Sequence, residues 1–182
     1  MLHHMLFSRL LAAASAVVLT VLSFLAPPQR IPDDDTVVRV GLCYGETGKS
    51  SITMHAAGGF TLGRAGGDGW KALLAVENET VIVSRLQSRP ITGEARYVNA
   101  APAIEAAERE DGTVFYENGI YMVAKGLSPA ASEPIFTVSD ENGSLLFLYG
   151  GAEALTLSAD AAIEFPADET LYSYRGRIEC RP

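Results

Sequence analysis

Residues 113–126 read TVFYENGIYMVAKG, and this stretch decides the fold class. Two runs of alternating aromatic and aliphatic residues flank Asn118-Gly119, a dipeptide that favours the tight turn of a two-residue β-hairpin. Asn142-Gly143 repeats the theme between PIFTVSD and SLLFLYGG, and the strand patterns ALTLSA and LYSYRGRIECRP follow. We therefore expect a mainly β, α+β protein built from several hairpins.

A helix is expected directly before the first hairpin. The sequence NAAPAIEAAERED, residues 99–111, is rich in Ala and Glu, and Ile104 and Ala107 stand at helical spacing. Helix and hairpin together predict a small α/β insert at residues 92–127, between β-rich segments at residues 37–91 and 128–182.

Side chains on the hairpin strands must divide between two faces, because successive residues of a strand point to opposite sides. One set packs on the helix, and the other either faces outward as an aromatic surface for sugar rings or packs against neighbouring β-segments. The two sets are Val114, Tyr116, Tyr121 and Val123 on one face, and Phe115, Ile120 and Met122 on the other. Tyr116 and Tyr121 are the candidate binding residues.

The segment at residues 37–91 opens with VVRVGLCYG, whose alternation predicts a strand with one buried face. Glycines at 58 and 59 interrupt SSITMHAAGGFTLG, which predicts a short strand pair around them. The two apolar runs of WKALLAVENETVIVSR are separated by Glu77-Asn78-Glu79, which predicts a hairpin.

A hydrophobic segment begins the chain. Residues 10–26 read LLAAASAVVLTVLSFLA without a charge, after Arg9 and before an acidic run at 33–35. That asymmetry predicts the N-terminus inside and the remainder outside the cell membrane. The length suits a signal-anchor, a cleaved secretory signal or, less readily, a buried core helix. Phe24 and Pro27 make cleavage after Ala26 unfavourable, although cleavage after Ser23 is tolerable, so we expect residues 1–26 to hold a cytoplasmic stub and an uncleaved anchor.

A proline- and aspartate-rich linker at residues 27–36 follows as a solvated stalk. The whole chain of 182 residues carries 14 Lys and Arg against 22 Asp and Glu, a net charge of −8. The excess lies beyond Pro27, because Arg9 is the only charged residue before it. A surface of that sign repels phosphate backbones, which excludes nucleic acid as a partner.

Motifs that suggest cofactors have simpler interpretations. Gly48-Lys49-Ser50 resembles the end of a phosphate-binding loop, but Cys43 stands where its first glycine is needed. The stretch at residues 67–72 matches a dinucleotide fingerprint literally, yet it lacks the preceding strand and predicts a turn. His55 has no ligand-spaced neighbours, and Trp70 is expected at the edge of the core. No cofactor, metal or catalytic residue is predicted.

Cys43 and Cys180 lie in the first and last strands expected in the exported part. An oxidising exterior permits a disulfide between them, but the distance between their Cα atoms cannot be read from the sequence, and two free thiols are the favoured alternative.

Three pieces of the chain, in this order, resemble the N-terminal region of the stage II sporulation protein D (SpoIID) and LytB family. They are VVRVGLCYG at residues 37–45, the hairpin with its preceding helix, and YRGRIECR at residues 174–181. The resemblance implies an insert similar to the peptidoglycan-binding sporulation-related (SPOR) repeat, and envelope work on peptidoglycan glycan strands or with another envelope protein.

In that family the catalytic glutamate lies downstream of the YRG strand, and no residue up to Pro182 corresponds to it. We therefore expect a non-catalytic module in sporulation or cell-wall remodelling. The alternative is one part of a split or truncated SpoIID-type lytic transglycosylase or amidase enhancer.

Overall fold

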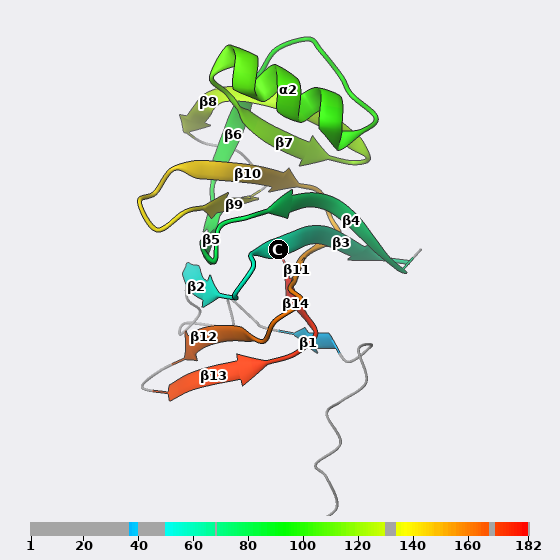
Figure 1. Ribbon diagram of the computed structural model, residues 1–182. Helices are drawn as coiled ribbons and strands as arrows, with labels where there is room; N and C mark the ends of the chain where they lie inside the picture. Colours follow the sequence, from blue (N-terminus) through cyan, green and yellow to red (C-terminus); the bar gives the residue numbers. More distant parts are fainter. Residues whose placement is uncertain (1–36, 40–49, 68, 130–133, 168–169, 182) are drawn as a thin grey trace, which may run out of the picture. The chain divides into compact units, whose positions relative to one another are not determined.

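Strands predominate in the computed structural model, which describes residues 37–39, 50–67, 69–129, 134–167 and 170–181 (Figure 1). Five of them form one sheet, in the order β1 (Val37–Arg39), β14 (Arg177–Cys180), β11 (Ala154–Ser158), β3 (Phe60–Gly66) and β4 (Gly69–Val76). β1 runs parallel to β14, and the other neighbours are antiparallel. The mainly β prediction is confirmed.

The other nine described strands form a second sheet. Their order is β13 (Thr170–Tyr174), β12 (Ile163–Ala167), β2 (Ser51–His55), β5 (Thr80–Leu86), β9 (Ile135–Ser139), β10 (Leu145–Gly150), β7 (Thr113–Glu117), β8 (Ile120–Pro129) and β6 (Ser88–Thr92). All neighbours are antiparallel except β10 and β7, which run parallel.

Both Asn-Gly hairpins are confirmed. β7 and β8 pair up to Glu117 and Ile120, and Asn118 and Gly119 have φ of 49° and 90°, as a type I′ turn requires. β9 and β10 pair across the second turn, where the Asp140 carboxylate accepts the backbone N–H groups of Asn142 and Ser144. These hydrogen bonds, that of Ser144 foremost, hold the pKa of Asp140 below its usual range.

The predicted helix is α2 (Ala100–Glu110), the only helix among the described residues. It packs against β7 and β8 through its small buried residues, Ala103, Ala106 and Ala107. It ends where Asp111 adopts a left-handed φ of 50° and Gly112 donates its N–H to the Ala107 carbonyl at 2.9 Å.

The predicted insert continues into the surrounding sheet. β7 lies between β8 and β10 in the nine-stranded sheet, so Val114 faces Phe147 and Tyr116 faces Tyr149 across a parallel pair. On the other side β8 pairs with β6, from the preceding segment. The described residues fall into one compact unit, so helix and hairpin share their core with the segments on either side.

The inward residues of the two sheets form a single apolar cluster. From the nine-stranded sheet it takes Val83, Val138 and Phe147, and from the five-stranded sheet Leu62, Leu155 and Ile178, all with no exposed surface, and α2 contributes its buried alanines. A smaller cluster lies on the opposite face of the hairpin and consists of Phe115, Met122, Ala124, Ile135 and Leu148.

Two predicted strand pairings are wrong. β2 and β3, on either side of Gly58-Gly59, lie in different sheets, and so do β4 and β5, on either side of Glu77–Glu79. Both short connections carry the chain across the core, from one sheet to the other. Apolar alternation defines which face of a strand is buried, but it does not define the neighbouring strand.

Of the two arrangements left open for the hairpin, the outward-facing one is wrong, because side chains on both faces are buried. Tyr116 and Tyr121 are only 3% and 5% exposed, and Phe115 and Met122 on the other face are 4% and 6% exposed. The alternative, packing against neighbouring β-segments, is confirmed: β10 and β6 flank the hairpin and extend its sheet.

Several N-terminal predictions lie outside the described residues. These are the anchor at 10–26, the linker at 27–36, Cys43, and the loop at Gly48–Lys49. No helix in the described part of the chain is long and apolar enough to cross a membrane.

Candidate functional site

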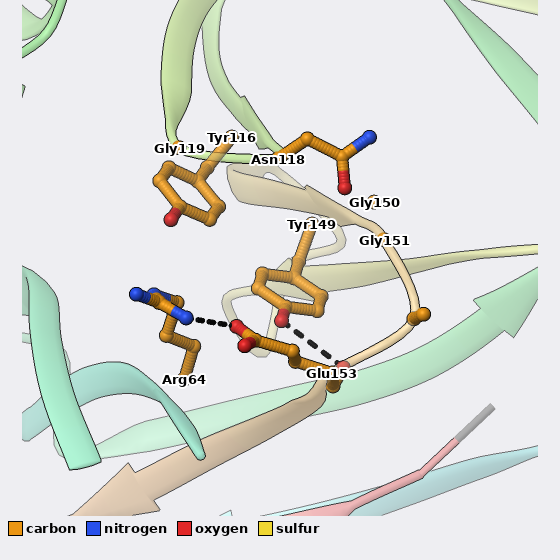
Figure 2. Close-up of a pocket in the computed structure, with 9 residues that line it drawn as sticks. Arg64, Tyr116, Asn118, Gly119, Tyr149, Gly150, Gly151 and Glu153 are labelled. Atoms are coloured by element: carbon orange, nitrogen blue, oxygen red, sulfur yellow. Dashed lines mark hydrogen bonds and ion pairs between the residues drawn. The ribbon is translucent and has the colours of Figure 1, made fainter. Parts of the chain in front are cut away.

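A cavity of about 350 Å³ opens beside the hairpin turn, where β3, β7 and β10 end near one another. Small-ligand pockets range over about 300–1,000 Å³, so this volume suits one compact group rather than a long chain. The lining residues are Arg64, Tyr116, Asn118, Gly119, Tyr149, Gly150, Gly151, Ala152 and Glu153 (Figure 2).

Two tyrosines form one wall of the cavity. The rings of Tyr116 and Tyr149 stack with centroids 5.9 Å apart and planes 15° from parallel, because the parallel pairing of β7 and β10 puts them side by side. The Tyr149 hydroxyl donates to the backbone carbonyl of Glu153 at 3.0 Å. Burial raises the pKa of Tyr149 well above its usual value, and the negative charge of Glu153 raises it further, so the Tyr149 hydroxyl keeps its proton.

The Tyr116 hydroxyl differs from that of its neighbour. Within the described residues it has no hydrogen-bond partner, although the side chain lines the cavity and is almost fully buried. The hydroxyl oxygen itself is not enclosed by protein but is accessible at the cavity, so water can satisfy it when no ligand is bound. This hydroxyl is therefore available to a polar group that enters the cavity.

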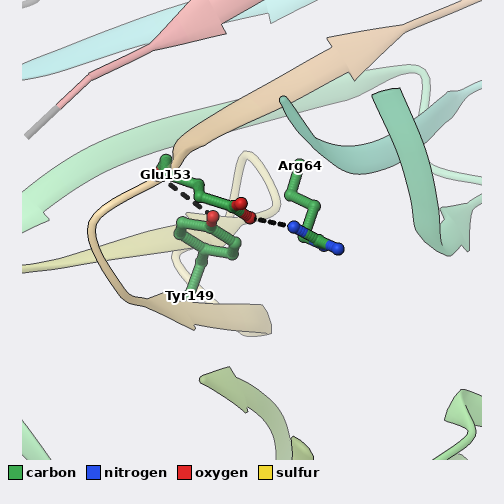
Figure 3. A network of polar contacts seen from close by, with 3 residues as sticks. All are labelled: Arg64, Tyr149 and Glu153. Carbon is green, nitrogen blue, oxygen red and sulfur yellow. Dashed lines mark hydrogen bonds and ion pairs between the residues drawn. The ribbon is translucent and has the colours of Figure 1, made fainter. Parts of the chain in front are cut away.

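Arg64 and Glu153 form an ion pair at the cavity (Figure 3). Arg64 comes from β3, and Glu153 from the turn between β10 and β11; their side chains are 19% and 38% exposed. The pair offers guanidinium donors and carboxylate acceptors next to the tyrosine hydroxyls. Together with the Asn118 amide, this set suits a ligand with several hydroxyl groups.

The two predicted binding residues have different positions. Tyr116 lines the cavity, whereas Tyr121 does not. The Tyr121 hydroxyl donates to the Leu73 carbonyl at 3.1 Å, and the ring contacts Tyr116 edge-on with centroids 4.9 Å apart. Burial raises the pKa of Tyr121, and its hydrogen bond to Leu73 joins β8 to β4.

Sequence reasoning missed three residues of the site, Arg64, Tyr149 and Glu153. The two members of the ion pair stand 89 positions apart in the chain, so no local pattern connects them. One signal was present: Arg64 follows Leu62 by two positions, and both stand on the inward face of β3 opposite Leu155 and Leu157 of β11. A charged residue at an inward strand position requires a partner or a ligand.

The other sequence candidates have structural roles. His55 is exposed, with Nδ1 3.2 Å from the Thr80 hydroxyl oxygen. Trp70 is 37% exposed, donates its indole N–H to Thr156 at 2.9 Å, and has the Arg177 guanidinium 5.2 Å from its ring centroid. No group of three or more His, Cys, Asp or Glu in the described residues suits a metal ion.

Cys180 is a buried, free cysteine within the described residues, while the predicted partner Cys43 lies outside them. The disulfide that the sequence leaves open, beside two free thiols, is therefore not tested by the described residues. Burial raises the pKa of the Cys180 thiol to about 12.

This burial leads to a reactivity prediction. In a Cys43→Ser variant we expect Cys180 to resist a thiol reagent at pH 8 while the protein is folded, and to react after unfolding, since only the thiolate is nucleophilic. The folded state holds this proton more tightly than the unfolded chain, whose thiol has a pKa of about 8.5. The thiol therefore costs no stability below that pH, and stability falls as the pH rises towards the folded value of about 12. Labelling at the same rate in both states would contradict the burial.

Comparison with known proteins finds no family model, no curated relative and no solved structure that matches the chain. The SpoIID/LytB resemblance thus stays a prediction from the motifs.

Proposed function

We propose that this chain is a non-catalytic, membrane-anchored envelope protein whose extracytoplasmic β-rich part binds peptidoglycan glycan through the cavity at Tyr116. The hydrophobic segment with its charge asymmetry supports the location. The motif resemblance supports a role in sporulation or cell-wall remodelling.

One observation carries the binding proposal: the Tyr116 hydroxyl lies in a cavity without a partner in the described residues, beside the Arg64–Glu153 pair. Sugar rings present many hydroxyls, and each can donate and accept. The small cavity favours a single sugar residue, such as a strand terminus, over a long glycan segment.

The test is retention of the full-length chain on peptidoglycan stripped of its stem peptides. Tyr116→Phe removes only the available hydroxyl and keeps the stacked ring. One hydrogen bond contributes about 0.5–1.5 kcal/mol, so we expect the apparent dissociation constant to rise about 2- to 13-fold, with the free energy of unfolding unchanged.

Tyr121→Phe is the matched control, because its hydroxyl bonds to the Leu73 carbonyl and lies outside the cavity lining. It should lose about 1 kcal/mol of stability and keep wild-type retention. Failure of the wild-type chain to be retained, or equal retention of wild type and Tyr116→Phe, would disprove glycan binding at this cavity.

A further inference from the structure

A second cavity, of about 410 Å³, opens where the last turns of α2 lie beside the end of β4. The starts of β7 and β10 complete its lining, which has no residue in common with the cavity at Tyr116. Its volume falls within the range of small-ligand pockets. This cavity is therefore a separate candidate site.

The buried part of the lining is apolar. Val76, Ala107 and Val114 line the cavity and belong to the apolar cluster between the sheets. Ile104 and Leu146 pack against the same cluster but are only partly buried, so they leave apolar surface open at the cavity. An apolar group that enters would remove this surface from water, which is favourable.

The exposed part of the lining is an acidic rim formed by Glu77, Glu108 and Asp111. Among the described residues that line the cavity there is no Lys or Arg, and none of the three carboxylates forms an ion pair with the described part of the chain. Glu110, by contrast, lies outside the lining and pairs with Lys125 at 3.0 Å. The C-terminal end of α2 adds partial negative charge, so the rim attracts cations.

We propose that this cavity binds a basic peptide segment in which one apolar side chain stands between two Lys or Arg residues. The apolar side chain covers Ile104 and Leu146, and the cations lie at the acidic rim. Two cations complement the site because the rim comes from two separate elements: Glu77 follows β4, whereas Glu108 and Asp111 belong to the end of α2. Alternate residues of an extended peptide share a face, so the expected pattern is basic-x-apolar-x-basic.

The first test is calorimetric titration of the full-length chain, in nonionic detergent, with the peptide Lys-Ser-Leu-Ser-Lys blocked at both ends. We expect saturable binding. Gln-Ser-Leu-Ser-Gln lacks both charges and should bind about 2- to 30-fold more weakly, since each exposed ion pair contributes up to about fivefold. Lys-Ser-Ser-Ser-Lys lacks the apolar side chain and should bind about tenfold more weakly or worse. Tyr116→Phe should bind the first peptide as the wild type does, because the two cavities share no lining residue.

The second test removes charge from the rim. Glu108→Gln combined with Asp111→Asn should raise the dissociation constant of the first peptide about 2- to 30-fold, and the difference should shrink at high salt. Asn readily adopts the left-handed φ of 50° found at position 111, so the end of α2 is preserved. Glu105→Gln combined with Asp160→Asn removes the same charge from exposed positions outside the lining and should change binding less than about twofold. The unfolding transition of Trp70 fluorescence verifies that each variant is folded.

Three results would overturn the proposal. The first is no saturable binding of the lysine peptide, and the second is equal binding of all three peptides. The third is equal weakening by the rim pair of substitutions and by the control pair, since that result would mean only general attraction to an acidic surface. None of these results depends on glycan binding at Tyr116, so the two proposals stand or fall separately.

Discussion

Phe147→Ala is expected to lower the free energy of unfolding by about 3–5 kcal/mol, the usual cost of removing a buried aromatic side chain. Phe147 has no exposed surface and lies on β10, which joins the hairpin to the rest of the nine-stranded sheet. Its neighbours across the strands are Val114 of β7 and Val138 of β9. The cavity left by its side chain would therefore weaken contacts on both sides of β10.

The informative measurement is the unfolding transition reported by Trp70, the only tryptophan of the chain. Trp70 lies on β4, in the five-stranded sheet, whereas Phe147 lies in the other one. Since one apolar cluster joins both sheets and α2, the denaturant midpoint of Trp70 fluorescence should fall together with that of far-UV circular dichroism.

Val98→Ala, at a position 74% exposed, is the control and should change stability by no more than about 0.5 kcal/mol. A Trp70 transition that stays at its wild-type midpoint while the circular dichroism transition moves would contradict a shared core. It would indicate instead that helix and hairpin fold as a separate insert.

Features set by local chemistry could be predicted from the sequence. Asn118 and Gly119 both adopt the positive φ of the first tight turn, Gly143 adopts it in the second turn, and each Asn-Gly dipeptide defines its own strand pair. The helix at 100–110 was predicted from its composition and spacing, and the structure agrees to within one residue at each end.

Features set by long-range packing could not be predicted. The apolar runs of β4 and β5 fit a hairpin as well as they fit a crossing between sheets, because both arrangements bury the same alternate residues. The outward-facing arrangement considered for one set of hairpin side chains failed for a related reason. Alternation correctly placed Phe115 and Met122 on one face and Tyr116 and Tyr121 on the other, but it did not reveal that an apolar cluster buries each face.

The candidate site combines both kinds of feature. Tyr116 was singled out by its hairpin, which the sequence defines locally. Its stacking partner Tyr149 arrives through the parallel pairing of β7 with β10, and Arg64 through β3 of the other sheet. The site combines residues from three strands that are far apart in the chain. Its one local sign in the sequence is Arg64, a charged residue among the inward positions of β3.

The crossing from β2 to β3 leads to the last prediction, a comparison of two adjacent glycines. Gly58 and Gly59 both have a left-handed φ, 83° and 84°. A Cβ on Gly58 would meet nothing within 4 Å, but a Cβ on Gly59 would lie 2.2 Å from the backbone carbonyl oxygen of Val76, at the end of β4. Alanine at either position incurs the conformational cost of about 1–2 kcal/mol, whereas only Gly59→Ala also forces backbone apart.

We therefore expect Gly58→Ala to lower the free energy of unfolding by about 1–2 kcal/mol. Gly59→Ala should lower it by a further 1–3 kcal/mol or so, the usual cost of overpacking, because Val76 belongs to the core and its carbonyl cannot move aside without displacing β4 from β3. Denaturant unfolding followed by Trp70 fluorescence measures the free energy of unfolding of both variants. Trp70 lies on β4, the strand that the clash displaces. Equal losses for the two variants would mean that the chain does not pass this close to Val76, and that the crossing between the sheets follows a different path.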